Sequence, residues 1–175
     1  GDWYGVRIDS PGTESTISNA VFRYGGKYYS GGGWTDSKAN LYIANSPATI
    51  SNSIFEYGKV YGVRLSAASS TFSGNTFKYN NNSEEGGSTG LYAELGTLTV
   101  NSNSFSNNRR GLYIANANST SVNSNTFTSN ANEAVSSYGY IGSFSNNSGS
   151  SNGVNAISLS GTITQNGATT TLAAN

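Results

Sequence analysis

Five segments of this 175-residue chain share one pattern. Each begins with an aliphatic residue or Phe, has Asn or Gly in the middle, and carries a Phe that is followed three residues later by Gly or Asn. The segments are ISNAVFRYG (17–25), ISNSIFEYG (50–58), FSGNTFKYN (72–80), VNSNSFSNN (100–108) and VNSNTFTSN (122–130). Their Phe residues are 33, 22, 28 and 22 positions apart, so the basic period is 22 and two copies are longer. A fixed period in this range is typical of stacked-repeat proteins.

A second short motif recurs together with the Phe segments. Its copies are GVRI (5–8), NLYI (40–43), GVRL (62–65), GLYA (90–93) and GLYI (111–114). Apolar and polar residues alternate in it, which is the period of a β-strand, and no window of the chain has sustained helical spacing. The chain is therefore predicted to be all-β, and each repeat is predicted to form one coil of a solenoid.

Stacking explains why the same residue types recur. A single coil cannot bury its apolar side, whereas stacked coils place equivalent residues about 4.8 Å apart. Four inward columns are expected: Phe22, Phe55, Phe77, Phe105 and Phe127; Ile17, Ile50, Phe72, Val100 and Val122; Val6, Leu41, Val63, Leu91 and Leu112; and Ile8, Ile43, Leu65, Ala93 and Ile114. The inward residues Asn75, Asn103 and Asn125 are expected to form an amide ladder.

A further column marks a turn. It consists of Gly25, Gly58, Asn80, Asn108 and Asn130. Because Gly and Asn tolerate positive φ most readily, one positive-φ turn geometry is expected to recur at these positions.

Composition excludes several classes of function. The nine basic and nine acidic residues give a net charge of zero, so neither nucleic acid nor an anionic membrane is an expected partner. No apolar run of about 18 residues is present, so membrane insertion is not expected. The absence of Cys and His excludes a disulfide, a thiolate nucleophile, a His-based zinc site and a Ser-His-Asp triad. The Ca²⁺-binding G-G-x-G-x-D nonapeptide is also absent, and no cofactor or metal site is expected.

The length fits one domain, residues 1–175, of six to seven coils with about 22 residues each. The first residues, GDWYGVRI, already have the pattern of a strand in mid-repeat, and the chain does not begin with Met. We therefore expect it to be a segment of a longer extracellular protein.

The pattern Asn-x-x-Phe-x-x-Asn followed by Gly-Leu-Tyr-Ile resembles the right-handed parallel β-helix repeats of bacterial extracellular proteins, a superfamily that includes the pectate-lyase-like proteins. The opening GDWYGVRI and the following ISNAVFRYGG are similar to a module of large secreted or surface-anchored β-helix proteins. The resemblance covers about residues 1–165. It implies a right-handed single-stranded parallel β-helix with three sheets, secreted or on the cell surface of a bacterium. The superfamily contains lyases, hydrolases, epimerases, tailspikes, adhesins and spacers, so the resemblance leaves the function open.

Aromatic and Arg residues mark the candidate site. The second position of the short motif is predicted to face outward and reads Arg7, Tyr42, Arg64, Tyr92 and Tyr113. Two insertions, residues 26–39 and 81–88, fall at the same phase of the repeat and are expected to emerge along one edge. Flat side chains with hydrogen-bonding tips suit sugar rings, so the predicted polysaccharide-binding residues are Tyr42, Arg64, Tyr92, Tyr113, Trp34, Tyr28 and Tyr29. The alternative is that stacked side chains stabilise the sheet by about 0.2–1 kcal/mol per pair without binding a ligand.

The preferred interpretation is a non-catalytic extracellular scaffold or adhesive module that binds polysaccharide or a cell-surface glycan. The alternative is a polysaccharide lyase or glycoside hydrolase, with Arg64 as the base and Arg7 and Lys59 behind it, or with Asp36 paired with Glu84 or Glu85. The acidic residues are scattered, so no catalytic residue is assigned. Arg23, Glu56 and Lys78 are instead expected to form a cross-coil charge ladder.

Ice binding by a flat solenoid would require a regular outward Thr array. The outward position of the short motif carries Tyr and Arg instead, so glycan binding is preferred to ice binding. The sequence leaves open which glycan is bound, whether the chain is an enzyme or a binding module, whether Ca²⁺ binds, what flanks the segment and what its oligomeric state is.

Overall fold

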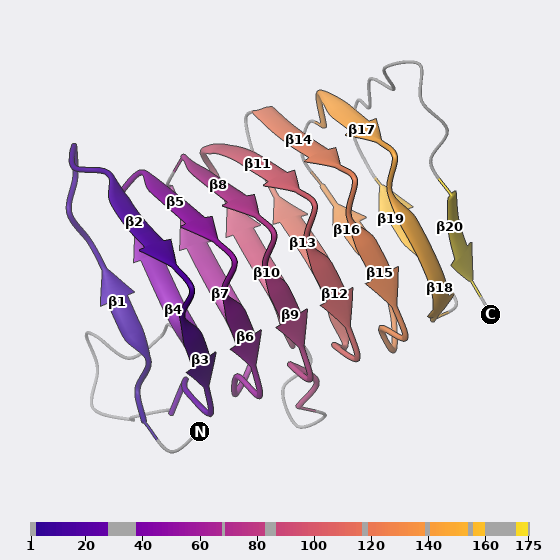
Figure 1. Cartoon of the computed structure of the whole chain (residues 1–175), viewed down its shortest axis with the longest axis horizontal. Coiled ribbons are helices and arrows are strands. Elements are labelled where there is room, and N and C mark those ends of the chain that lie inside the picture. The colour runs from indigo at the N-terminus through magenta and orange to yellow at the C-terminus, as the bar shows by residue number, and fades with distance from the viewer. Residues whose placement is uncertain are drawn as a thin grey trace.

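The computed structural model describes residues 3–27, 38–67, 69–82, 87–116, 119–138, 141–153, 156–159 and 171–174. Within these ranges the chain is all-β, and three parallel sheets run along a solenoid (Figure 1). From β1 to β18, successive strands enter sheets A, B and C in turn, so each of these coils contributes one strand to each sheet; β19 and β20, the last two described strands, join sheets A and C. The described part of the chain contains no helix long and apolar enough to cross a membrane.

The strands of the described residues divide as follows. Sheet A contains β1 (Val6–Ile8), β4 (Ala39–Ala44), β7 (Tyr61–Ser66), β10 (Thr89–Glu94), β13 (Arg110–Ala115), β16 (Val135–Ser137) and β19 (Ile157–Leu159). Sheet B contains β2 (Ser15–Ser18), β5 (Ala48–Ser51), β8 (Ser70–Ser73), β11 (Thr97–Asn101), β14 (Ser119–Asn123) and β17 (Ser143–Ser145). Sheet C contains β3 (Val21–Arg23), β6 (Ile54–Glu56), β9 (Thr76–Lys78), β12 (Ser104–Ser106), β15 (Thr126–Thr128), β18 (Ser148–Asn152) and β20 (Thr171–Ala174).

The predicted Phe column is confirmed as a continuous interior stack. Neighbouring ring centroids from Phe22 to Phe127 lie 5.2, 5.2, 4.7 and 4.9 Å apart, and the ring planes are within 16° of parallel. The four rings after Phe22 are fully buried. Apolar burial of this size is the main stabilising term of the solenoid.

The three aliphatic columns are also in register, one rung per coil. Two of them continue beyond the five repeats found in the sequence. Val122 is followed by Phe144 on β17, and Leu112 by Val135 and Ile157 on β16 and β19. The Phe column itself ends, because Gly149 takes the next rung after Phe127.

The predicted amide ladder of Asn75, Asn103 and Asn125 is confirmed and extends to Asn147. Each Nδ2 donates to the Oδ1 of the next Asn, over 3.0, 3.1 and 3.0 Å. The same Nδ2 atoms donate to backbone carbonyls of sheet B. The ladder therefore satisfies buried backbone groups at the bend between sheets B and C, where no strand pairing is available.

The expectation of positive φ at Gly25, Gly58, Asn80, Asn108 and Asn130 is wrong. The positive φ falls one residue earlier, at Tyr24 (60°), Tyr57 (53°), Tyr79 (57°), Asn107 (55°) and Ser129 (55°). The three Asn residues of the predicted turn column are instead fully buried and, with Asn152, form a second amide ladder with Nδ2–Oδ1 distances of 2.9, 3.1 and 2.9 Å. At Gly58 the requirement is space, because an added Cβ would lie 2.3 Å from the carbonyl oxygen of Tyr61.

Candidate ligand-binding site

Strand alternation in sheet A places the predicted aromatic and Arg residues on the outer surface. On β4, for example, Leu41 and Ile43 are fully buried, and Tyr42 between them is partly exposed. The pairing of β1, β4, β7, β10 and β13 then aligns five side chains on successive strands, namely Arg7, Tyr42, Arg64, Tyr92 and Tyr113. We call this column the Tyr/Arg ladder.

Guanidinium groups sandwich the first ring of the Tyr/Arg ladder. The Cζ atom of Arg7 lies 4.9 Å from the ring centroid of Tyr42, and that of Arg64 lies 5.4 Å from the same centroid. Arg64 is also 5.9 Å from the ring centroid of Tyr92. Each such cation–π contact is worth about 0.5–1 kcal/mol at an exposed site.

The remaining rings stack on one another. The rings of Tyr92 and Tyr113 are 5.2 Å apart and nearly parallel, at 9°. Tyr61 lies 5.0 Å from Tyr92, and Tyr138 lies 5.7 Å from Tyr113, both in tilted arrangements. Because these contacts run along the solenoid axis, they cover the ring faces. A ligand lying along the ladder would therefore meet ring edges, whereas the sequence-based expectation was contact with ring faces.

Carboxylates balance the charges beside the ladder. Arg7 Nη2 is 2.7 Å from Asp9 Oδ2, and Arg64 Nη2 is 3.6 Å from Glu94 Oε2. The hydrogen bond from Arg7, and then the one from Asn45, lowers the pKa of Asp9. The surface is thus polar but locally close to neutral.

The phenol groups of Tyr92 and Tyr113 in the ladder remain protonated at neutral pH. Burial raises the pKa of Tyr92 to about 12, and the neighbouring Glu94 carboxylate and Tyr61 act in the same direction. Burial likewise raises the pKa of Tyr61 and of Tyr113. Each of these three phenols therefore keeps an O–H that can donate a hydrogen bond.

A second Tyr column lies at the bend between sheets C and A. The exposed rings of Tyr24, Tyr57 and Tyr79 stack with centroid separations of 5.2 and 5.1 Å. They line a shallow depression together with Lys59. The two insertions leave this same bend, one between β3 and β4 and one between β9 and β10, which confirms that they share one edge.

Four of the predicted binding residues come together in the ladder: Tyr42, Arg64, Tyr92 and Tyr113. Tyr28, Tyr29 and Trp34 lie outside the described residues, as do the candidate acids Asp36, Glu84 and Glu85.

The sequence-based prediction missed Tyr61 and Glu94, which both contact the ladder. A signal for Tyr61 was present. It directly precedes GVRL, at the same phase as Thr89 and Arg110 before the next two copies of the motif.

The charged residues of sheet C form the predicted cross-coil ladder. Glu56 lies 3.2 Å from Arg23 and 3.3 Å from Lys78. Within the described ranges, no three Asp or Glu residues gather closely enough to hold a metal ion.

Residues 4–172 match the family model described as the right handed beta helix region. The chain belongs to this family. No curated protein and no solved structure matches it. Family membership agrees with the three parallel sheets and sets the handedness of the solenoid, but β-helices carry both enzymes and binding proteins, so it does not set the activity.

Proposed function

We propose that this β-helix is a non-catalytic extracellular scaffold module that binds a polysaccharide along the Tyr/Arg ladder. The observation that carries the proposal is the alignment of Arg7, Tyr42, Arg64, Tyr92 and Tyr113 on five successive strands. Four steps of about 4.8 Å give a row roughly 19 Å long. A straight row of equal-phase groups suits an extended polymer better than a compact molecule.

The chemistry of the ladder supports a hydroxyl-rich ligand. Protonated phenols and guanidinium groups donate hydrogen bonds, and sugar hydroxyls accept and donate them. The side chains are already held by ring stacking and cation–π contacts, so binding would cost little additional side-chain entropy.

The arrangement around Arg64 favours binding over catalysis. A lyase needs a base that is open toward the substrate and a cation site built from carboxylates. The carboxylate beside Arg64 is that of Glu94, which forms an ion pair with the guanidinium group. Glycoside hydrolysis needs two carboxyl groups about 5–9.5 Å apart across the scissile bond, and the ladder itself contains no Asp or Glu.

A glycan array tests the proposal with two matched triple variants. Tyr42→Ala, Tyr92→Ala and Tyr113→Ala remove the rings of the ladder, and Tyr24→Ala, Tyr57→Ala and Tyr79→Ala remove the stacked rings of the neighbouring bend. The wild-type protein and the second variant are expected to bind the same glycans, and the ladder variant is expected to lose them. Circular dichroism of each variant checks that the solenoid is folded.

The opposite pattern, with binding lost only in the bend variant, would move the site away from the ladder and contradict the proposal. So would the release of unsaturated sugars that stops in Arg64→Ala, because that result would identify a lyase.

A further inference from the structure

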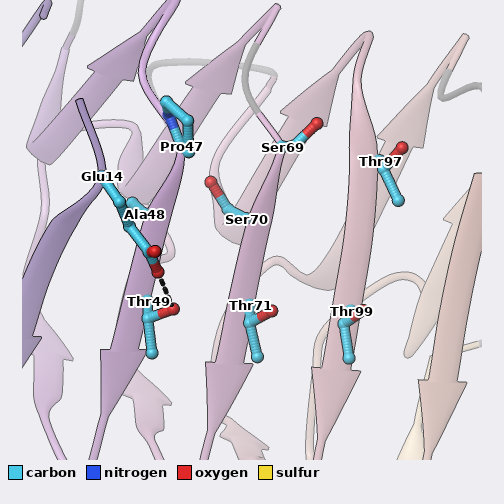
Figure 2. A pocket seen from close by; sticks show the side chains of 9 residues that line it. All are labelled: Glu14, Pro47, Ala48, Thr49, Ser69, Ser70, Thr71, Thr97 and Thr99. Atoms are coloured by element: carbon cyan, nitrogen blue, oxygen red, sulfur yellow. Dashed lines mark hydrogen bonds between the residues drawn. The ribbon is translucent and has the colours of Figure 1, made fainter. Parts of the chain in front are cut away.

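The outer surface of sheet B carries a regular column of threonines. Thr16, Thr49, Thr71 and Thr99 occupy equal positions on β2, β5, β8 and β11, and Ser121 and Ser143 continue the column on β14 and β17. Figure 2 shows three of these side chains at the same level on adjacent strands. Each lies between inward residues, such as Ala48 and Ile50 around Thr49, and is itself partly exposed.

Two further columns make this surface three residues wide. On one side, Pro47, Ser69 and Thr97 line a shallow depression together with Thr49, Thr71 and Thr99 (Figure 2). On the other side, the column two residues further along the strands reads Ser18, Ser51, Ser73, Asn101, Asn123 and Ser145. We call these three columns the hydroxyl face. Its outward side chains are small, and none of those named is aromatic.

Charge is depleted on the hydroxyl face. Among the described strands, none of those in sheet B contains a charged residue, whereas Arg and Glu occur in those of sheet A, and Arg, Glu and Lys in those of sheet C. Glu14 is the exception: it stands two residues before Thr16, at the same phase as Pro47, it lines the depression, and it accepts a hydrogen bond from Thr49 Oγ1 over 2.6 Å. An uncharged face is complementary to a ligand surface without net charge, because a charged side chain would lose hydration energy against it.

The spacing and stiffness of the hydroxyl face suit a crystalline ligand. Strands repeat about every 4.8 Å across the sheet, and every second residue repeats about every 6.6 Å along it. Water oxygens in ice repeat over similar distances in two dimensions. Thr has one methyl and one hydroxyl group on a stiff χ1, so both groups keep fixed positions above a rigid core. Within the described residues, Thr71 and Thr99 make no side-chain hydrogen bond, which leaves their hydroxyls for such a ligand.

We propose that the hydroxyl face of sheet B binds ice. This reverses the ranking made from the sequence, where the Thr array was sought on the face that carries Tyr and Arg. A sugar polymer fits less well, since the outward columns lack aromatic groups and consist of short side chains. The proposal is independent of the Tyr/Arg ladder, which lies on a different sheet.

Partition into slowly growing ice and microscopy of ice recrystallisation test this proposal. The face variant combines Thr71→Lys and Thr99→Lys. The matched control combines Thr76→Lys and Thr128→Lys, at outward positions of sheet C. The wild-type protein and the control are expected to be enriched severalfold in the ice over an inert protein of similar size and to slow recrystallisation. The face variant is expected to fall to the level of the inert protein.

Circular dichroism and a thermal melt establish that the variants are folded. If the double Lys variant is unfolded, Thr71→Tyr replaces it, because Tyr favours strands but breaks the flat surface, and the same loss is expected. The proposal is overturned if the wild-type protein is not enriched in ice, or if a folded face variant is enriched as much as the wild type. Glycan binding that the face variant abolishes, without enrichment in ice, would identify a sugar-binding face and overturn it too. The triple Tyr variant of the ladder should keep its ice affinity.

Discussion

Replacing Asn103 by Ala would test whether the buried amide ladder holds the coils together. Oδ1 of Asn103 accepts hydrogen bonds from the backbone N and from Nδ2 of Asn75, over 2.9 and 3.0 Å. Its Nδ2 donates to the carbonyl oxygens of Phe72 and Asn101, both over 3.0 Å, and to Oδ1 of Asn125 over 3.1 Å. The side chain is 2 % exposed, so water cannot replace these partners without opening the solenoid.

The expected loss of stability follows from these contacts. The backbone N–H of Asn75 would be buried without an acceptor, which costs about 1–3 kcal/mol. The other lost bonds contribute about 0.5–1.5 kcal/mol each, less what the remaining partners recover. We therefore expect Asn103→Ala to lower the free energy of unfolding by roughly 3–5 kcal/mol, a large part of the 5–15 kcal/mol that is typical of a domain.

Urea denaturation followed by circular dichroism measures this change, provided that unfolding is a single transition. Ser104→Ala is the matched control, since Ser104 is the next residue, partly exposed and at an outward position, and a change within about 0.5 kcal/mol is expected. A decrease in the free energy of unfolding below about 1 kcal/mol for Asn103→Ala, with an unchanged m-value, would refute the reasoning, because the amide ladder would then contribute little to stability.

Two further changes have clear expected results. Gly58→Ala should unfold or strongly destabilise the chain, because the added Cβ would lie 2.3 Å from the carbonyl oxygen of Tyr61. Gly12→Ala is the control: no atom lies within 4 Å of its added Cβ, so it should cost only the strain of its positive φ, about 1–2 kcal/mol. Thermal melts of both variants check this difference. Tyr92→Phe should remove an ionisation near pH 12 from the ultraviolet titration. Burial raises this pKa in the folded state above 10.0. The stabilisation from the neutral phenol is therefore complete below pH 10 and is lost as the pH rises toward 12. The difference in unfolding free energy between the wild type and Tyr92→Phe should change over that pH range.

The interior was predictable because it follows directly from periodicity. In a parallel β-helix, residues of equal phase occupy the same position in successive coils and lie directly above one another, so the Phe residues at 22, 55, 77, 105 and 127 had to meet. The Asn75, Asn103 and Asn125 ladder follows for the same reason. The Tyr/Arg ladder follows as well, since Tyr42 alternates with inward Leu41 and Ile43.

The bend between sheets C and A was less predictable. Gly and Asn indicate a turn, but the sequence does not say which residue takes the positive φ and which side chain turns inward. In the structure Tyr57 and Tyr79 have the positive φ. Asn80 is buried because its Oδ1 accepts a hydrogen bond from the backbone N–H of Gly58 over 2.8 Å. This choice depends on the neighbouring coil.

The outer surfaces proposed to bind ligands also depend on the alignment of neighbouring coils. The sequence marked the outward Tyr and Arg residues, but only the register showed that their ring faces cover one another. The sequence pattern did not predict the Thr column, because its members lie in strands of unlike sequence. Thr16, Thr49, Thr71 and Thr99 belong to STIS, ATIS, STFS and TLTVN. Its regularity becomes visible once the strands are aligned side by side.

The sequence by itself determined the period, the all-β coil and the residues of the apolar columns. A position that is buried in every coil needs an apolar residue each time, so apolar residues recur at the same phase of the sequence. Only the tertiary structure decided how polar groups distribute between the inside, the bends and the three outer faces. Asn, Ser, Thr and Tyr are stable in several of these environments, so their positions depend on the partners that adjacent coils supply.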